Sequence, residues 1–386
     1  MSGTVSIVIP MYMEGEYVQT TLESIAESVL ASSIKTPPNV IAVVNNPKVI
    51  SESRKEENRE TLSILYSKKN TLPYPLHIFD YTDPGLDFGV GQARKIGMDY
   101  ASHHFAKAAH DKIICLDADC TVSKNYISRL QNLHGFGSGF TVEFEHALDQ
   151  KGMVLYELYL RYMQKKLAQS GSPFSHFPIG SSLGVSAQAY RESGGMVKKT
   201  ATEDFHFLNK IRKHGDITHL SDTFVYPSNR KSQRVSLGTG YFLYHYSRDS
   251  KQSFSSLMIP SPADFLSLQQ LHQIIYDQSQ DNESCKRNLS QLRLSSINLH
   301  LERRKFWDKR RLALQQNLQH STFHKRIMEA FDALESLRLL RVLSEQHEKP
   351  SPPLFLSWIQ SIDDQLLGIH HAQELLIQLR RTSLRT

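Results

Sequence analysis

Two carboxylates, Asp117 and Asp119, close the short apolar run IICLDADC at residues 113–120. The apolar part of this run is typical of a buried β-strand. Because side chains alternate along a strand, the two acids point the same way if the strand continues that far. Neighbouring carboxylates repel each other, and a cation relieves the repulsion. The pair therefore predicts a site for Mg²⁺ or Mn²⁺, which bind carboxylate oxygens and substrate phosphates. A solvated turn in which Asp119 caps the next helix is the alternative.

A second pair of acids, Glu203 and Asp204, lies in TEDFHFLNKIRKHGD at residues 202–216. Thr202 is a residue type that begins helices, and Gly215 is one that ends them. We therefore expect both acids in a first helical turn, where the helix dipole favours their ionised forms. Such acids occur at ordinary helix starts. They also suit general-base catalysis, in which a carboxylate removes the proton of an attacking hydroxyl group.

Several apolar runs in the first 120 residues have the pattern of strands, with helix-like segments between them. The strand-like runs are residues 5–9, 40–44, 76–79 and 113–116, and the helix-like segments are roughly 16–31, 51–67 and 90–108. This alternation predicts an α/β fold with a parallel sheet. Ligands of such sheets bind beyond the carboxyl ends of the strands. We therefore expect a shared rim formed by Pro10 to Glu14, Asn45, Asn46, Asp80, Asp117 and Asp119.

The segment LDFGVGQARKIGMDYA, residues 86–101, follows the third strand and contains Gly89 and Gly91. Arg94 stands where a dinucleotide-binding fingerprint requires its third glycine, and that fingerprint follows a first strand, so we exclude it. A glycine-rich helix start that carries Gln92 and Arg94 still suits a phosphate-bearing ligand, through amide donors and positive charge. Solvated side chains at an ordinary helix start are the alternative.

The composition suggests a protein of two or three domains without disulfides. The chain has 386 residues, a net charge of +6, and three cysteines whose spacing fits neither a disulfide framework nor a zinc site. We see no signal peptide and no run long enough to span a membrane, and we expect a cytoplasmic protein. The modest charge and the lack of a recognisable module argue against nucleic-acid binding.

Toward the C-terminus glycine nearly vanishes and helical periodicity dominates. We predict a helical C-terminal domain, residues 251–386, after an α/β domain at residues 1–250. Within the helical part, LERRKFWDKRRLAL at residues 301–314 has six basic residues together with Phe306 and Trp307. Such a helix could lie on an anionic membrane surface. An ordinary helix that packs through its two aromatic residues is the alternative.

Four motifs, in this order, resemble those of the family 2 glycosyltransferases of GT-A fold. PMYMEGEY is similar to the family's PxYNE signature, with Met13 where asparagine is usual. GVGQARKIGMDYA is similar to its GxxxARNxGI segment, and LDADC resembles its LDADD metal site. The fourth motif is similar to its G…GGF…ED block and here consists of Gly180, Gly194, Gly195, Met196, Thr202, Glu203 and Asp204. The resemblance covers about residues 5–215.

The resemblance implies a GT-A fold. This is a Rossmann-like mixed sheet with helices on both faces, and here an all-α C-terminal region would follow it. Within the α/β domain, residues 1–120 would form the nucleotide-sugar half and residues 121–250 the acceptor half.

The resemblance also implies roles for the acids. Asp119 and Asp117 would hold Mg²⁺ or Mn²⁺, and Asp204, with Glu203 beside it, would be the catalytic base.

Two departures from the family pattern concern the donor. The second strand ends in Asn45 and Asn46 where paired aspartates are usual, although asparagine can still hydrogen-bond a base or ribose. The QxxRW motif of processive members is absent, and RKSQRVSLGTGY at residues 230–241 takes its place, where Arg234 could close over the donor phosphates. The residues that we expect to bind the nucleotide sugar are Pro10, Tyr12, Glu14, Asn45, Asp80, Gln92, Arg94, Asp117 and Arg234.

We therefore expect a metal-dependent, inverting glycosyltransferase of the hexosyltransferase type that acts in cell-surface or polysaccharide glycan synthesis. The donor would be UDP- or GDP-linked, and the acceptor a glycan, a lipid-linked molecule or a small molecule. The protein would be cytoplasmic, with contact to the inner face of the membrane through its helical C-terminal region. Two alternatives stay open. A nucleotidyltransferase of similar fold would release pyrophosphate, and a nucleotide-sugar-binding protein would catalyse nothing.

Overall fold

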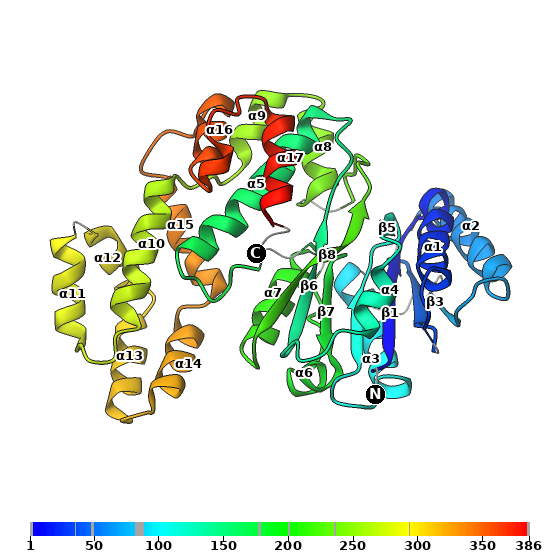
Figure 1. The fold of residues 1–386 in the computed structure, drawn as a ribbon, viewed down its shortest axis with the longest axis horizontal. Helices are drawn as coiled ribbons and strands as arrows, with labels where there is room; N and C mark the ends of the chain where they lie inside the picture. Colours follow the sequence, from blue (N-terminus) through cyan, green and yellow to red (C-terminus); the bar gives the residue numbers. More distant parts are fainter. Residues whose placement is uncertain are drawn as a thin grey trace. The chain divides into compact units, whose positions relative to one another are not determined.

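The chain forms two compact units, which we describe separately (Figure 1). The computed structural model describes residues 3–34, 36–47, 50–81, 89–176, 179–199, 201–234, 237–292 and 294–383. The first unit consists of Met1–Met153, Pro178–Tyr244 and Ser383–Thr386, and the second of Val154–Phe177 and His245–Thr382. The domain boundary at residue 250 and the division at residue 120 stay predictions. Residues 86–88 of the glycine-rich segment and 235–236 of the donor loop lie outside the described residues.

The first unit is built on one mixed sheet of eight strands in the order β3-β2-β1-β4-β7-β6-β8-β5. The strands are β1 (Val5–Met11), β2 (Asn39–Asn45), β3 (Leu76–Tyr81), β4 (Lys112–Cys115), β5 (Cys120–Val122), β6 (Gly139–Phe144), β7 (Leu183–Ser186) and β8 (Ile217–Pro227). The four predicted strands are present as β1 to β4, and they are parallel to one another. β7 is antiparallel to both β4 and β6, and β8 is parallel to β6. β8 therefore runs in the same direction as β4, and its carboxyl end faces the same rim.

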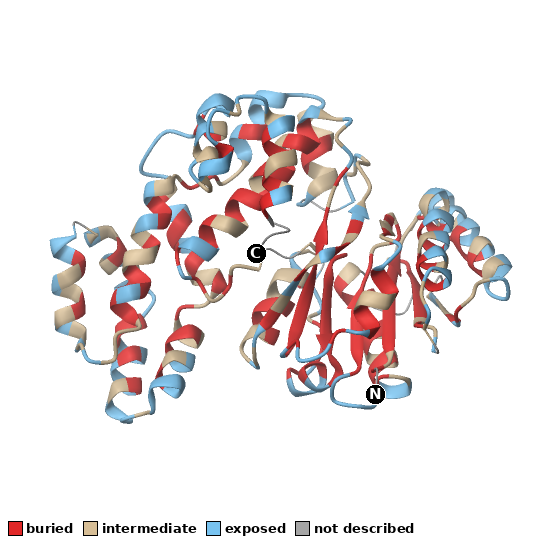
Figure 2. Cartoon of the chain, viewed as in Figure 1, coloured by how far each residue is buried: buried red, intermediate tan, exposed pale blue. Residues whose placement is uncertain are grey.

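Helices cover both faces of this sheet. Because successive side chains on a strand point to opposite faces, Ile7 and Ile9 of β1 join one apolar core and Val8 joins another. The first core includes side chains of α1 (Gly15–Leu30), α2 (Glu52–Lys68) and α4 (Tyr126–Gln131). The second includes side chains of α3 (Val90–His104), α6 (Ala187–Glu192) and α7 (Glu203–Arg212). Figure 2 shows most strands of the sheet buried, and β1, β2 and β4 are buried along nearly their whole length, which explains why they are apolar runs in sequence. The predicted mixed sheet with helices on both faces is confirmed.

The described part of the second unit is helical, as predicted for the C-terminal region. Its helices are most of α5 (Lys151–Gln169), the end of α8 (Thr239–Tyr246), α9 (Ser250–Ser256), α10 (Pro262–Ile275), α11 (Asn282–Gln291), α12 (Ser295–Arg303), α13 (Phe306–Gln315), α14 (His320–Ala330), α15 (Ala333–Ser344), α16 (Pro352–Gln360), the short η1 (Asp364–Leu366) and α17 (Ala372–Ser383). Glu157 of α5 is fully buried and accepts hydrogen bonds of 2.8 Å from Arg161 and from Arg380 of α17. This buried ion cluster ties the last helix to α5.

The predicted continuous basic helix at residues 301–314 is wrong. α12 ends at Arg303 and α13 begins at Phe306, and Lys305 between them has a left-handed backbone with a φ of 52°. Phe306 and Trp307 are buried, so neither is an exposed apolar anchor. This segment thus packs through its two aromatic residues, as the alternative expected. Contact of the C-terminal region with a membrane surface stays a prediction.

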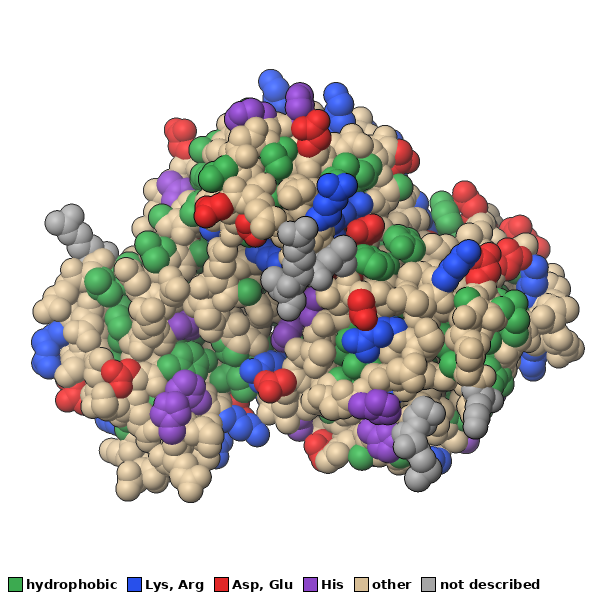
Figure 3. Space-filling model, viewed as in Figure 1, with side chains coloured by type: hydrophobic (Ala, Val, Ile, Leu, Met, Phe, Trp, Pro, Cys, Tyr) green, Lys and Arg blue, Asp and Glu red, His purple; other side chains and the backbone are tan. Residues whose placement is uncertain are grey.

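Two further observations concern the surface and the helices. In the part of the chain that the structure describes, no helix is both long and apolar enough to cross a membrane. On the face shown in Figure 3, the described acidic and basic side chains are interspersed.

Candidate active site

Asp117 and Asp119 lie on a tight turn that follows β4. The strand ends at Cys115, and the backbone N–H of Cys120 donates to the carbonyl oxygen of Asp117 (3.2 Å). One carboxylate oxygen of each acid and the sulfur of Cys120 lie within 4.8 Å of one another. The acids are close because of this turn, whereas the predicted strand alternation does not extend to them. The next helix begins only at Tyr126, so Asp119 does not cap it.

Arg94 of α3 joins the two predicted pairs of acids. Its side chain is buried; Nη2 donates to Asp117 at 2.5 Å, and Nη1 forms a short ion pair with Glu203. A Cβ atom at Gly180 would overlap the guanidinium group of Arg94, which explains why a residue without a side chain stands there. Arg94 is therefore a buried bridge between residues that are 86 positions apart in sequence, Asp117 and Glu203.

Thr202 and the two acids after it begin α7. The helix begins at Glu203, but the predicted cap is wrong, since the Thr202 side chain makes no capping hydrogen bond. Thr202 instead has a left-handed backbone, with a φ of 59°, which is strained for a β-branched residue and typical of functional sites. Glu203 is buried against Arg94, whereas Asp204 is half-buried and accepts a hydrogen bond of 2.7 Å from the backbone N–H of Phe205.

Asp204 is the acid whose titration is most clearly shifted. Burial, helped by the negative charge of Glu203, raises its pKa to about 6. A carboxylate with this pKa is ionised at neutral pH and is still a better proton acceptor than an ordinary aspartate. Adjacent acids in different surroundings can therefore take different roles.

Glu14 lies in the turn between β1 and α1, and the fold holds this turn tightly. Its backbone N–H donates to the Thr61 hydroxyl (3.1 Å), and the N–H of Met13 donates to Oδ1 of Asn58 (2.6 Å). Met13 has a left-handed backbone with a φ of 58°, a conformation that asparagine tolerates better than methionine does. Burial raises the pKa of Glu14, although hydrogen bonds and charge from Arg230 oppose the shift.

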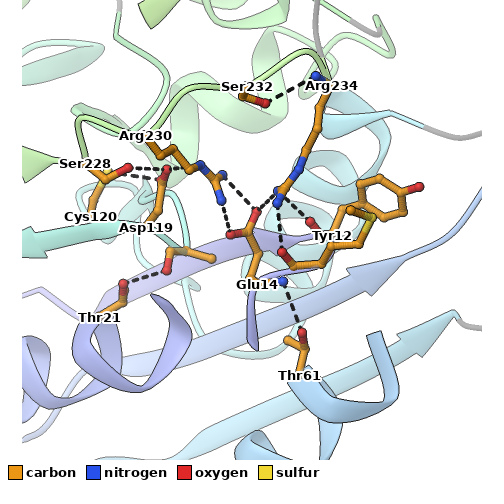
Figure 4. Close-up of polar contacts among 12 residues, drawn as sticks. Tyr12, Glu14, Thr21, Thr61, Asp119, Cys120, Ser228, Arg230, Ser232 and Arg234 are labelled. Carbon is orange, nitrogen blue, oxygen red and sulfur yellow. Dashed lines mark hydrogen bonds and ion pairs between the residues drawn. The ribbon is translucent and has the colours of Figure 1, made fainter. Parts of the chain in front are cut away.

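Two arginines from the segment after β8, residues 228–234, hold Glu14 and Asp119 (Figure 4). Arg230 donates to both oxygens of Glu14, at 2.6 and 3.0 Å, and its Nε lies 2.6 Å from Oδ2 of Asp119. Arg234 donates to Glu14 at 2.6 Å and to the carbonyl oxygens of Tyr12 and Met13 at 2.7 and 2.9 Å. The Ser228 hydroxyl donates to the same oxygen of Asp119, at 2.8 Å.

Sequence reasoning missed Arg230 because it did not recognise β8 as a strand. β8 runs in the same direction as β4, so residues just beyond its carboxyl end are expected at the rim that holds Asp119. The same rule that selected the acids after β4 therefore selects Arg230 once β8 is known. Arg234 was predicted to close over the donor, and it lies against the β1–α1 turn.

The end of β2 and the start of α3 contain buried polar atoms with unused hydrogen-bonding capacity. Asn45 is buried, its Nδ2 donates to the Gly89 carbonyl oxygen (3.4 Å), and its Oδ1 has no partner among the described residues. Gln92 is also buried, and the same holds for its Oε1. Asn46, by contrast, accepts a hydrogen bond from Asn58 of α2. Buried polar atoms are rarely left unpaired, so a bound ligand is one expected partner for Asn45 and Gln92.

Other predicted donor residues have different surroundings. The backbone N–H of Gly91 donates to the Lys199 carbonyl oxygen (3.2 Å), so this N–H is bound to the protein itself and not directed at a phosphate. Pro10 is buried within β1, Tyr12 is half-buried, and Asp80 is exposed on β3.

A cavity of about 390 Å³ opens beside Asp119. Its lining combines aromatic rings, hydroxyl groups and two carboxylates. The residues are Tyr17, Thr20, Thr21, Asp119, Thr121, Glu145, His146, Ala147, Tyr226, Pro227 and Ser228. Its volume is within the range of about 300–1,000 Å³ that is common for small-molecule sites.

The net charge of the site would be balanced by a divalent cation. Five acids and three arginines take part, so two negative charges remain when every acid is ionised; the groups are Glu14, Asp117, Asp119, Glu203, Asp204, Arg94, Arg230 and Arg234.

The donor set near Asp119 also suits such a cation. The arginines use Oδ1 of Asp117 and Oδ2 of Asp119, and Oδ1 of Asp119 accepts a hydrogen bond from the Cys120 thiol (3.8 Å). Burial and the charge of Asp119 raise the pKa of the Cys120 thiol well above its usual range, which disfavours the thiolate form that binds metal ions. An oxygen-only donor set fits Mg²⁺ or Mn²⁺.

Residues 6–192 match the family model for glycosyl transferase family 2. This part of the chain belongs to glycosyl transferase family 2. The match includes the metal-side acids and Arg94, and it ends before Glu203, Asp204 and Arg230. Among curated proteins, none matches the chain.

Two solved structures are similar to the chain at low sequence identity. S. aureus TarS 1–349 in complex with UDP-GlcNAc is 14% identical, with a TM-score of 0.42 over 99% of this chain and 90% of that one. The mannosyltransferase PcManGT from Pyrobaculum calidifontis, in complex with GDP-Man and Mn²⁺, is 13% identical, with a TM-score of 0.41 over 100% of this chain and 88% of that one.

Proposed function

We propose that this member of glycosyl transferase family 2 is a metal-dependent, inverting enzyme that moves a hexosyl group from a UDP- or GDP-linked donor to an acceptor hydroxyl. One observation carries the proposal. Arg94 binds both Asp117, on the proposed metal turn, and Glu203, which precedes the proposed base Asp204. A single buried side chain thus joins the two halves of the chemistry, departure of the diphosphate and deprotonation of the hydroxyl.

Two buried hydrogen-bond acceptors support the proposed binding of a nucleotide-sugar donor. Asn45 Oδ1 and Gln92 Oε1 are acceptors without partners among the described residues, and a base or ribose offers N–H and O–H donors. An unpaired buried acceptor costs about 1–3 kcal/mol, so a ligand that pairs these atoms binds more tightly. A divalent cation held by Asp117 and Asp119 would stabilise negative charge on the departing diphosphate.

Asp204 acts on the acceptor. The acceptor oxygen attacks C1 of the donor sugar while its proton passes to the Asp204 carboxylate, and the bond between C1 and the diphosphate oxygen breaks. A pKa of about 6 leaves Asp204 ionised and basic enough for this role at neutral pH. Glu203, which is paired with Arg94, positions the start of α7. A single displacement of this kind inverts the anomeric carbon.

The setting of the enzyme is proposed from its cysteines and its family. Cys115, Cys120 and Cys285 are buried and form no disulfide, which suits a reducing compartment. We therefore propose a cytoplasmic enzyme that acts at the inner face of a membrane in cell-surface or polysaccharide glycan synthesis. Its acceptor would be a glycan, a lipid-linked molecule or a small molecule.

Binding and product analysis together test the proposal. Thermal shift against a panel of UDP- and GDP-linked sugars, with and without Mn²⁺, should reveal one donor class whose stabilisation of the protein needs the metal. With that donor the product should be a nucleoside diphosphate. Release of pyrophosphate from a nucleoside triphosphate would instead identify a nucleotidyltransferase, and binding without any turnover would identify a non-catalytic protein.

A further inference from the structure

Arg230 binds one carboxylate oxygen of Asp119, the acid on which the proposed metal site depends. Its Nε lies 2.6 Å from Oδ2 of Asp119, and its two terminal nitrogens bind Glu14. The guanidinium carbon also lies 5.0 Å from the centre of the Tyr17 ring. All three nitrogens of the guanidinium are therefore engaged, and Figure 4 shows the group between the two acids.

A divalent cation at Asp119 would lie next to this guanidinium group. Two positive charges on one carboxylate repel each other, and the repulsion is stronger in a partly buried site than in water. The side chains of Asp119 and Arg230 are only 15% and 21% exposed, so solvent screens this repulsion poorly.

We propose that Arg230 and the divalent cation compete for Asp119, and that the diphosphate of the nucleotide draws Arg230 away and so admits the cation. The inference rests on the proposed function, because it concerns the metal site of that reaction. Guanidinium groups bind phosphate oxygens as readily as carboxylates, so the diphosphate offers Arg230 an alternative partner. Metal and nucleotide then strengthen each other's binding by the same factor.

The contacts around Arg230 allow it to leave without unpairing its neighbours. Arg234 continues to neutralise Glu14, and two backbone carbonyl oxygens fix its position. Ser228 continues to hold Asp119 through its hydroxyl, and its backbone N–H donates to the Asp119 carbonyl oxygen at 3.1 Å. Arg230 is thus the exchangeable member of the cluster.

Mn²⁺ binding to the full chain tests the proposal directly. The concentration of free Mn²⁺ is followed by its electron paramagnetic resonance signal, for the wild type and for Arg230→Gln, with the metal alone and with UDP or GDP added. Arg230→Gln should bind Mn²⁺ alone at least tenfold more tightly than the wild type. UDP or GDP should strengthen Mn²⁺ binding to the wild type at least tenfold and should strengthen it much less in the variant.

Two further variants serve as controls for charge and for the loss of an arginine elsewhere. Arg230→Lys retains the charge but cannot hold both acids with one nitrogen, and it should have an intermediate affinity. Arg129→Gln removes an arginine from an exposed ion pair with Asp222 in the same unit, and it should bind Mn²⁺ as the wild type does. Thermal unfolding of each protein verifies that it is folded.

The outcomes separate this inference from the proposed function. If the wild type and Arg230→Gln bind Mn²⁺ alone equally tightly, and Asp119→Asn abolishes that binding, the metal site stands and the competition is overturned. If no protein binds Mn²⁺ even with UDP and GDP present, both the metal site and the competition are overturned.

Discussion

Replacing Asp204 with asparagine should abolish transfer and, at neutral pH, make the protein more stable. Burial and the charge of Glu203 hold the pKa of Asp204 at about 6, whereas an unperturbed aspartate has a pKa of about 3.9. The folded protein therefore prefers the protonated side chain, and ionisation of Asp204 costs stability. The asparagine side chain is uncharged at every pH and avoids this cost.

The size of the effect follows from the two pKa values. A difference of about two units corresponds to about 3 kcal/mol, at roughly 1.4 kcal/mol per unit. Below about pH 4 the carboxyl group is protonated in both the folded and the unfolded chain, so wild type and variant should differ little. The cost to the wild type accumulates as the pH rises to about 6, and it is complete above that pH. At pH 7.5 the variant should melt roughly 6–12 °C higher in the transition of the first unit.

Thermal unfolding at about pH 4 and pH 7.5, together with a transfer assay at pH 7.5, measures both effects. Loss of a general base should lower the rate by about 10²–10⁴-fold. Asp216→Asn is the matched control, because that side chain is 86% exposed in the same unit, and its stability change should stay within about 0.5 kcal/mol at either pH. If Asp204→Asn is no more stable than the wild type at pH 7.5, the raised pKa is refuted. If it transfers sugar at the wild-type rate, the role as base is refuted.

Three other substitutions test separate parts of the structure. Arg94→Gln leaves Glu203 charged and buried without its partner, so calorimetry should show the first unit destabilised by about 3–5 kcal/mol, and a change below 1 kcal/mol would contradict the buried bridge. Met13→Asn relieves a left-handed backbone and should raise the free energy of unfolding by about 0.5–1 kcal/mol in urea titrations, whereas a loss would show that methionine packing matters more. Glu157→Gln removes the buried negative charge that Arg161 and a second arginine of the second unit share, and it should lower the melting transition of that unit by an amount equivalent to about 3–5 kcal/mol. Unchanged melting would mean that the cluster does not stabilise that unit.

The sequence could predict those parts of the site that follow from strand order. Apolar runs identified β1 to β4, and the rule that ligands bind beyond strand ends selected Asp117, Asp119 and Asn45. Arg94 was predicted for its charge near a helix start, but its contact with Glu203 depends on how α3 and α7 pack, which no local pattern encodes. The region after residue 130 contained no clear strand pattern, so β8 and the arginine that follows it were missed.

Backbone conformation was the other source of error. Threonine is a residue type that often caps helices. Thr202 has a left-handed backbone instead, and its side chain makes no capping hydrogen bond. Lys305 interrupts a segment whose helical periodicity is unbroken in sequence. That segment contains neither glycine nor proline, so nothing in it signals the interruption. Both residues have positive φ values, which residue type alone does not reveal.

Release of nucleoside diphosphate from the donor that stabilises the protein is the most direct test of the central claim. The account predicts Mn²⁺- or Mg²⁺-dependent release with inversion at C1 in the wild type, which disappears on chelation and in both Asp119→Ala and Asp204→Asn. Undiminished release in these two variants, or in the wild type after the metal is removed, would contradict it.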